Sequence, residues 1–237
     1  TKENWRKPTI NILCTAIYLY TIETFKKGNF KSYLINFKSY FSILLRNLTW
    51  AKELRIFIVK NNLQDAFYYD YWFENATIAL AYLKKQKVIN TVISRSHRFD
   101  LYDESWGRNG KVPFRSFKIN QLNSVYTVAL HGKEYFQNKV KPHLRDKIKL
   151  SYLGIEIPER IHSEVPKKDS FLIVSASNTR DFKRVDLVPE VLTKLNKNIK
   201  WVHFGSGPMD DAVIENIEGL PSNVKAEFKG FVPNLEV

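Results

Sequence analysis

From about residue 66 onward, short apolar runs alternate with stretches in which apolar residues recur at helical spacing. The runs predict strands over 66–72, 88–94, 125–130, 147–153, 171–174 and 199–204. Between them, helical spacing predicts helices over 73–85, 133–140 and 185–195, with a further short helix after a loop at 103–113. Strands and helices that alternate with short links predict parallel sheets covered by helices on both faces. The fold class is therefore α/β.

Residues 1–62 are predicted to be helical, because their apolar residues recur only at helical spacing. Apolar side chains form a stripe beside which Lys31, Lys38 and Arg46 lie. A basic and aromatic stripe of this kind could lie on a lipid surface. A helix that turns the stripe toward the core is the other interpretation, and the one we favour. The stripe consists of Phe30, Tyr33, Leu34, Phe37, Phe41, Leu44, Leu45 and Leu48.

The stretch 171–208 reads as one strand–loop–helix–strand–loop unit. Its first strand, 171–174, carries no charge, which predicts burial on both faces of a sheet. A polar loop follows and ends in the adjacent cations Lys183 and Arg184; the second strand runs into Gly205-Ser-Gly207-Pro208. Loops at the carboxyl ends of parallel strands bind ligands in doubly wound sheets, and a following helix adds amide donors. A lysine in such a loop suits a diphosphate, so we expect a nucleotide-type ligand.

This half contains three ordered motifs: Ser175-Ala-Ser-Asn178 with Lys183-Arg184-Val185-Asp186, then His203-Phe-Gly205-Ser-Gly207-Pro208, then Phe228-Lys-Gly230-Phe231-Val232. Together they resemble the motifs of the group 1 glycosyltransferases (family 4, GT-B fold). In the other half, 69–73 and 93–102 also fit, so the resemblance runs from about Ala66 to the end. It implies two Rossmann-like domains with parallel sheets. It further implies a retaining, metal-independent transfer of sugar from a nucleoside-diphosphate sugar to a glycan or lipid-linked acceptor, in bacterial cell-surface polysaccharide synthesis.

The resemblance also assigns residues. Lys183 matches the lysine that holds the donor diphosphate, and a fixed cation would stabilise the charge that develops there. Where many members have an arginine, this chain has Asn178, so Arg180 or Arg184 would supply a second cation. His97 matches a histidine near the transferred sugar, as a sugar contact or a proton carrier. The remaining expected donor contacts are Gly205, Gly207 and Pro208, which the family implies for the nucleotide, and Gly230, Phe231 and Val232 for its base.

Other residues near His97 leave alternatives open. Asp100 and Glu104 could be general bases, although ordinary loop acids are the favoured interpretation. The aromatic cluster of Tyr68, Tyr69, Tyr71, Trp72 and Phe73 could stack on a sugar or lipid-linked acceptor, or could pack in the core. No metal site is expected, because there is no Asp-x-Asp triplet and no His pair at helical spacing. No cofactor is expected either, since the nucleotide sugar is a substrate.

The positive charge is confined to one half of the chain. The 237 residues carry +13, but residues 1–153 hold 26 Lys and Arg against 11 Asp and Glu, while 154–237 hold 11 against 13. A pI near 9.6 alone would suggest nucleic acid. The neutral second half and the lack of a nucleic-acid motif count against that. A basic module could instead be attracted to an anionic membrane surface.

We expect a basic N-terminal acceptor-side domain over 1–153 and the start of a nucleotide-sugar domain over 154–237, with the boundary between Gly154 and Pro166. Both domains are expected to be incomplete: no first strand with its glycine-rich turn is found, nor the family's paired-glutamate motif, so the fragment itself is expected to be inactive.

The single cysteine, Cys14, is expected to be a small buried residue in a reducing compartment. Without a signal peptide or an apolar stretch of spanning length, a cytoplasmic protein is predicted, peripheral at the inner membrane face if it binds lipid. A non-catalytic nucleotide- or glycan-binding module is the alternative function.

Overall fold

The computed structural model describes residues 8–107, 109–154 and 170–233. The chain divides into two compact units, Thr1–Glu156 and Ile157–Val237, and each is described by itself. The boundary expected between Gly154 and Pro166 lies almost wholly outside the described residues, so its position stays a prediction.

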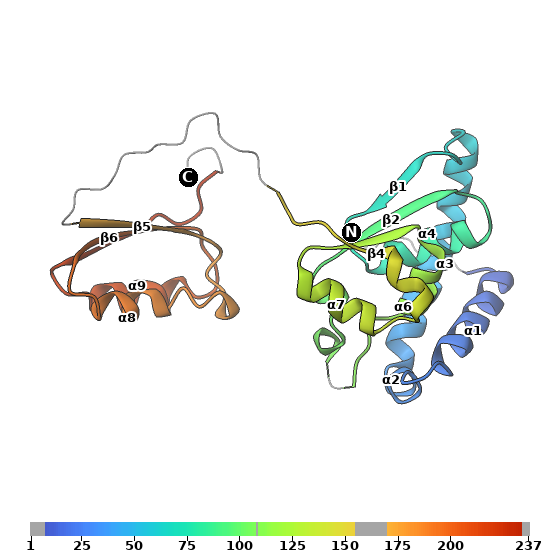
Figure 1. Cartoon of the computed structure of the whole chain (residues 1–237), viewed down its shortest axis with the longest axis horizontal. Helices are drawn as coiled ribbons and strands as arrows, with labels where there is room; N and C mark the ends of the chain where they lie inside the picture. Colours follow the sequence, from blue (N-terminus) through green and yellow to red (C-terminus); the bar gives the residue numbers. More distant parts are fainter. Residues whose placement is uncertain (1–7, 108, 155–169, 234–237) are drawn as a thin grey trace. The chain divides into compact units, whose positions relative to one another are not determined.

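The N-terminal unit is built on a four-stranded parallel sheet in the order β1-β2-β3-β4. Three helices (α1–α3) precede the sheet, and the rest connect its strands (Figure 1). The elements are α1 (Ile10–Thr24), α2 (Phe30–Ile35), α3 (Phe37–Lys60), β1 (Phe67–Asp70), α4 (Asn75–Lys85), β2 (Thr91–Ser96), α5 (Arg98–Leu101), η1 (Asp103–Trp106), α6 (Arg115–Gln121), β3 (Ser124–Thr127), α7 (Leu130–Asn138), η2 (Pro142–Lys147) and β4 (Ile148–Leu150).

The C-terminal unit contains a second parallel sheet, in the order β5-β6-β7. Its core is small and is centred on Trp201, which is fully buried. The elements are β5 (Ser170–Ala176), η3 (Asp181–Lys183), α8 (Leu187–Thr193), β6 (Asn198–Phe204), α9 (Asp210–Glu218) and β7 (Val224–Phe228). The predicted α/β class with two parallel sheets is confirmed.

The prediction that both faces of each sheet are covered is wrong for the described residues. Figure 1 shows α8 and α9 on the same side of β5 and β6. Strands that follow one another in order, with crossovers of one hand, place every connecting helix on one face. Because β5 is also an edge strand, Phe171, Leu172 and Val174 are about half exposed, and the expectation of a strand buried on both faces fails with it. In the N-terminal unit, Phe67 and Tyr69 of the edge strand β1 are likewise exposed.

The apolar stripe of the first 62 residues is divided between two helices and two environments. Asn36 separates α2 from α3. Tyr33, Leu44 and Leu48 are buried in the core, whereas Phe30, Leu34 and Phe37 are more than half exposed. The favoured core-facing interpretation therefore holds for one part of the stripe only.

Cys14 is exposed rather than buried. It lies on the outer side of α1 together with Leu13, Ile17 and Tyr18, which are also exposed. Ile12, Ala16 and Leu19 occupy the inner side of the same helix. The apolar character of α1 on both sides hides this division from a reading of the sequence.

No helix within the described ranges is long and apolar enough to cross a membrane.

Candidate functional site

The carboxyl ends of β5, β6 and β7 bring the three C-terminal motifs together. The pairing aligns Ala176 with Phe204 and His203 with Phe228, so the loops that follow these strands are neighbours. Backbone hydrogen bonds join them: Ser177 N donates to Phe204 O at 3.0 Å and Gly205 N donates to Gly230 O at 2.7 Å. The sheet therefore assembles the motif residues that the resemblance assigned to the donor.

The two glycines of the turn allow one loop to lie against another. A Cβ at Gly205 would lie 2.0 Å from Ser177 O, and Gly205 has φ +124°, which favours glycine. A Cβ at Gly207 would meet the Thr179 carbonyl and hydroxyl oxygens at 3.0 Å. The absence of a side chain at these glycines lets the turn 205–207 approach the loop 177–179 closely. The two glycines therefore determine how the turn packs against that loop.

Asp210, the first residue of α9, fixes the geometry of the same loop. One of its carboxylate oxygens accepts hydrogen bonds from the Thr179 hydroxyl and, at 2.8 Å, from Gly207 N. Asp210 and Asp211 occupy the first turn of α9. Two carboxylates in this first turn oppose the positive end of the helix dipole and make it less favourable for an added anion. Side-chain cations also supply positive charge at this sheet edge.

Lys183 is one of the cations at this sheet edge. It ends the turn η3, and its side chain is exposed. Within the described ranges no ion pair involves Lys183, whose amine lies 5.9 Å from the centre of the Phe182 ring. The guanidinium of Arg184, by contrast, is 3.6 Å from Asp186. Asn178 and Arg180 are exposed in the same loop, and Pro208, Gly230, Phe231 and Val232 follow the neighbouring strands.

A small hollow beside this loop is not the phosphate site. Its volume is about 370 Å³, and its charged lining consists of Asp181, Asp186 and Arg184. Two carboxylates against one cation repel an anion. Lys183 does not line this hollow.

His203 is a residue of this region that the sequence analysis did not assign. Its side chain is fully buried; Nδ1 lies 2.8 Å from Ser175 Oγ, and Nε2 has no hydrogen-bond partner in the described structure. Burial lowers the pKa of His203, against the opposing effects of a Ser177 backbone hydrogen bond and the Asp210 charge. A neutral ring packed 5.5 Å from Phe228 stiffens the end of β6, from which the glycine turn starts.

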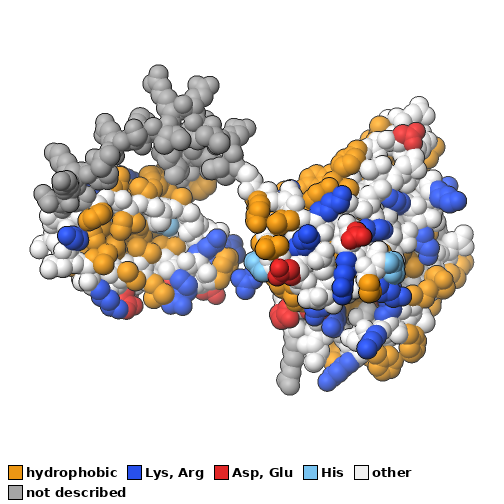
Figure 2. Space-filling model, in the orientation of Figure 1, with side chains coloured by type: hydrophobic (Ala, Val, Ile, Leu, Met, Phe, Trp, Pro, Cys, Tyr) orange, Lys and Arg blue, Asp and Glu red, His pale blue; other side chains and the backbone are white. Residues whose placement is uncertain are grey.

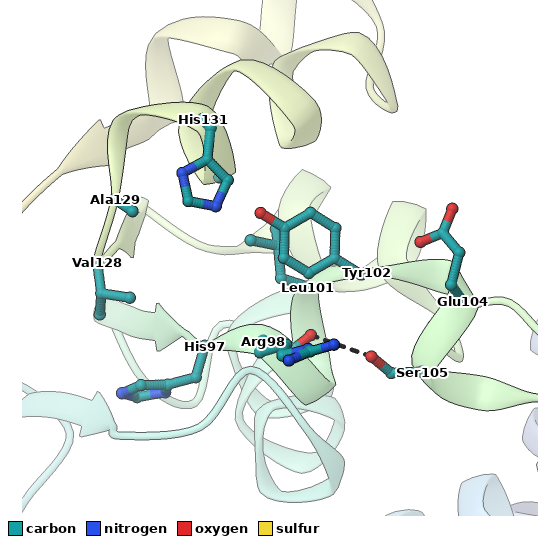
Figure 3. A pocket seen from close by; sticks show the side chains of 10 residues that line it. His97, Arg98, Leu101, Tyr102, Glu104, Ser105, Val128, Ala129 and His131 are labelled. Atoms are coloured by element: carbon teal, nitrogen blue, oxygen red, sulfur yellow. Dashed lines mark hydrogen bonds between the residues drawn. The ribbon is translucent and has the colours of Figure 1, made fainter. Parts of the chain in front are cut away.

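In the N-terminal unit, the carboxyl ends of β2 and β3 open onto a cavity of about 650 Å³ (Figure 3). His97 follows β2, and His131 belongs to the first turn of α7. Figure 3 shows these two histidines on different sides of the cavity. The polar and charged lining consists of His97, Arg98, Tyr102, Glu104, Ser105 and His131.

His97 lies between two aromatic rings. Its ring centre is 4.8 Å from that of Tyr71 and 4.2 Å from that of Trp72. Neither ring nitrogen has a hydrogen-bond partner among the described residues. Burial, and then the charge of Arg95, lower the pKa of His97. Both nitrogens are also buried, and the lowered pKa favours the neutral imidazole at neutral pH.

Asp100 positions His97. The buried Asp100 carboxylate accepts hydrogen bonds from His97 N at 2.5 Å and from Phe73 N at 2.6 Å. Burial raises its pKa, against several hydrogen bonds that lower it. Asp100 thus joins the β1–α4 loop to the β2–α5 turn, in keeping with the favoured view of a loop acid. Glu104 is exposed and accepts a hydrogen bond from the Tyr135 hydroxyl at 3.3 Å.

Part of the aromatic cluster over 68–73 packs in the core, and part is exposed and could stack on a ligand. Phe73 is fully buried in the core, and the Tyr68 hydroxyl donates to Leu63 O. Tyr69, Tyr71 and Trp72 are about half exposed. Only these three remain available to stack on a ligand beside His97.

Lys118 is a second residue that the sequence analysis missed, since nothing in its neighbourhood marks it as buried. The Lys118 side chain is buried, with the residue only 1% exposed. Its amine donates a hydrogen bond to Phe73 O at 2.6 Å and lies over the Phe73 ring, 4.1 Å from the ring centre. The pKa of Lys118 is lowered to about 7, mainly by burial. The negative charges of Asp100, Asp70 and Glu74 act in the opposite direction, whereas the charge of Arg115 lowers the pKa further.

We expect this burial to make stability depend on pH. Between about pH 7 and the ordinary lysine pKa of 10.5 the unfolded chain binds the proton that the folded chain gives up. The free energy of unfolding should therefore rise with pH in this window, by up to about 1.4 kcal/mol per unit. Urea unfolding of Lys118→Met, compared with Lys60→Met on the exposed side of α3, measures it. Equal pH slopes in the wild type and Lys118→Met would contradict the prediction.

Solved structures with a similar fold were found for this chain. The lipopolysaccharide outer core galactosyltransferase WaaB, in its apo form, matches with a TM-score of 0.58 at 14% identity, covering 81% of this chain and 50% of WaaB. MurG from Acinetobacter baumannii matches with a TM-score of 0.50 at 11% identity, covering 83% of this chain and 48% of MurG. Each unit has the fold of a GT-B half. No protein-family model and no curated protein matches the sequence.

The GT-B fold confirms the resemblance at the level of architecture, and the chain spans about half the length of WaaB and MurG. In GT-B terms, the loops after β5, β6 and β7 and the cavity after β2 and β3 both occupy carboxyl strand ends, where such sheets bind ligands. The roles assigned to His97, Lys183 and the other site residues remain predictions. Arg98, Tyr102 and His131 were missed, although His131 follows β3 as His97 follows β2, and the same rule would have found it.

The described residues contain no group of side chains that could hold a metal ion.

Proposed function

We propose that the chain is part of a glycosyltransferase that moves a sugar from a nucleoside-diphosphate donor to a glycan or lipid-linked acceptor. The observation that carries the proposal is the Lys183 loop. It lies at the carboxyl edge of a GT-B sheet, is fixed by Asp210 and two glycines, and presents an amine without an ion pair among the described residues. A positioned cation of this kind stabilises the negative charge of a departing diphosphate.

In the proposed reaction, the bond between the anomeric carbon and the diphosphate oxygen breaks, and the acceptor hydroxyl oxygen bonds to the same carbon. The diphosphate leaves with the bonding electrons, and the acceptor hydroxyl gives up its proton. We propose that Lys183, with Arg180 or Arg184, holds the diphosphate and that His97 takes the proton. We further propose retention of the anomeric configuration and no requirement for a metal.

The acceptor would belong to a bacterial cell-surface polysaccharide. WaaB, which shares the fold, is a galactosyltransferase of the lipopolysaccharide outer core. The half-exposed rings of Tyr69, Tyr71 and Trp72 offer apolar faces on which a sugar can stack. We propose that the enzyme acts in the cytoplasm at the inner face of the membrane, to which the basic N-terminal half is attracted.

A thermal-shift panel tests the donor assignment with this chain. UDP, GDP and ADP, with their sugar conjugates, are each added at increasing concentration. One nucleotide is expected to raise the midpoint of unfolding with concentration, because a ligand that binds only the folded state stabilises it; at 100 times Kd the gain is about 2.7 kcal/mol. If no nucleotide stabilises the chain at millimolar concentration, the donor assignment is wrong.

His97→Ala is expected to lower the rate of sugar transfer in the complete protein at least about tenfold, because a positioned proton carrier contributes 10² or more where it acts. Donor binding should be unchanged. His143→Ala, which changes an exposed histidine of η2, is the matched control. Transfer at the wild-type rate by a folded His97→Ala protein would remove His97 from the reaction.

A further inference from the structure

A second hollow in the N-terminal unit, of about 380 Å³, gathers cations from three separate segments. Lys31 comes from α2, Lys111 from the loop after η1, and Lys139 follows α7. Ser32 and Asp103 line the same hollow. Glu104 lines both this hollow and the His97 cavity, but the lysines line this one alone.

One buried carboxylate holds two of the lysine amines together. The same oxygen of Asp103, Oδ2, lies 3.3 Å from Lys139 Nζ and 3.5 Å from Lys111 Nζ, while Oδ1 lies 2.9 Å from Arg115. Burial raises the pKa of Asp103, but the charge of Arg115 and the hydrogen bonds outweigh it, so the pKa falls below its ordinary value. An ionised Asp103 fixes Lys111 and Lys139, and each amine, with three N–H donors, keeps a donor for a further acceptor.

The hollow retains excess positive charge. Among the described residues of the lining, Lys31, Lys111 and Lys139, with Arg115 behind them, are opposed by the carboxylates of Asp103 and Glu104 alone. Lys31 is exposed and makes no ion pair with any described residue. Fixed amines that converge on an open space favour an anion there.

Ser32 supplies an observation that does not depend on charge. Its residue is 3% exposed, and its hydroxyl has no hydrogen-bond partner in the described structure. Buried hydroxyls are nearly always paired, since an unpaired one loses its bonds to water without replacement. Because Ser32 lines the hollow, an oxygen-bearing ligand in it would satisfy the hydroxyl.

The surroundings of the hollow indicate where the anion comes from. On α2, Leu34 and Ile35 lie three and four residues beyond Lys31 and are more than half exposed, as are Phe25, Phe30 and Phe37 nearby in sequence. Between residues 24 and 52 there is no Asp or Glu, against six Lys and Arg. Figure 2 shows Lys and Arg side chains gathered over the visible face of this unit, with hydrophobic ones along the edge where α1 and α2 lie. Exposed aromatic and aliphatic side chains beside basic ones are typical of a surface that enters the lipid headgroup layer.

We propose that this hollow binds the phosphate group of an anionic membrane lipid, with the exposed apolar side chains of α2 inserted beside it. The inference gives the proposed membrane attachment a defined site. It does not depend on donor binding, so failure of one leaves the other standing.

Sedimentation with lipid vesicles tests the proposal. The chain is mixed with vesicles of phosphatidylcholine alone or with one quarter phosphatidylglycerol, in about 0.1 M salt, where charges beyond about 10 Å are screened. Ser32→Ala removes the hydroxyl without changing charge and is expected to weaken binding to the anionic vesicles about three- to tenfold, as the loss of one hydrogen bond does. Lys31→Gln is expected to weaken it about fivefold.

Ser39→Ala and Lys52→Gln are the matched controls, because both residues are exposed on α3 outside the hollow. Each should change the affinity less than about twofold, since screening weakens an exposed charge away from the bound group. Circular dichroism and the unfolding midpoint confirm that each variant is folded. Ser32→Ala binding as the wild type does, or Lys31→Gln weakening no more than Lys52→Gln, would leave a general basic surface and overturn the site.

Inorganic pyrophosphate, titrated by calorimetry, separates the sources of phosphate. Vesicle binding that depends on Ser32 and that pyrophosphate competes away supports the lipid assignment. Pyrophosphate binding that depends on Ser32, without vesicle binding, would overturn the lipid assignment and leave a site for a free phosphate. Stronger binding to a short RNA than to anionic vesicles would likewise overturn it.

Discussion

Lys183→Ala is expected to lower the affinity of this chain for its nucleoside diphosphate about 10- to 100-fold, because a hydrogen bond to a charged group contributes about 1.5–3 kcal/mol. In the complete protein, the rate of sugar transfer should fall about 10²- to 10³-fold, as when a donor to developing charge is removed. The physical reason is that Asp210 and Asp211 in the first turn of α9 offset the positive end of that helix. Few other positive groups at this edge can replace the amine.

Calorimetry with the nucleotide found by the thermal-shift panel measures the change in affinity. Lys197→Ala, which removes an exposed lysine from the same unit away from the loop, should bind as the wild type does. Rescue in part by Lys183→Arg would indicate that charge is the main requirement. If Lys183→Ala and Lys197→Ala bind equally well, the donor phosphate is held elsewhere and the functional assignment of this loop is wrong.

Gly205→Ala is expected to destabilise the C-terminal unit by about 2–5 kcal/mol, from the combined cost of overpacking and of a strained backbone. The new Cβ would meet Ser177 O at 2.0 Å, and φ is +124°. Because the obstructing atom belongs to the backbone, no side-chain rotation relieves the contact. The loop that carries Lys183 would have to move, so nucleotide affinity should fall together with stability.

Gly219→Ala is the matched control for this change. Gly219 follows α9 with φ −84°, and a Cβ there would meet only Asn216 O, at 3.9 Å. Hydrogen exchange of the β6 amides reports on the C-terminal unit specifically, where the fluorescence of several tryptophans would not. Protection of β6 in Gly205→Ala equal to that in Gly219→Ala would show that the loop accommodates the methyl group.

The sequence predicted the order of most elements and the α/β class correctly. Each strand of the two sheets that it predicted was found within a few residues, because an apolar run bounded by polar loops is a local signal. It also placed Lys183 and Gly205 after successive strands, and parallel pairing then requires those loops to be neighbours.

Burial was predicted less well. Phe171, Leu172 and Val174 read as a buried strand, yet β5 is at an edge with one face uncovered by described residues. Cys14 and Phe37 read as core residues and are exposed. Conversely, Lys118 reads as a surface lysine and is buried against Phe73. An apolar residue can lie on either side of a helix without changing the local pattern, so the pattern alone cannot decide burial.

By itself, then, the sequence determined which segments become strands and helices and which residues stand at the carboxyl ends of the strands, since propensity and periodicity act over a few residues. Only the tertiary structure decided that Gly205 and Gly207 serve the contact with loop 177–179, and that Asp210 occupies the helix end expected to bind phosphate. It alone brought Lys31, Lys111 and Lys139 to one hollow. Those arrangements join residues tens of positions apart, and packing and electrostatics across such separations leave no periodic trace in the chain.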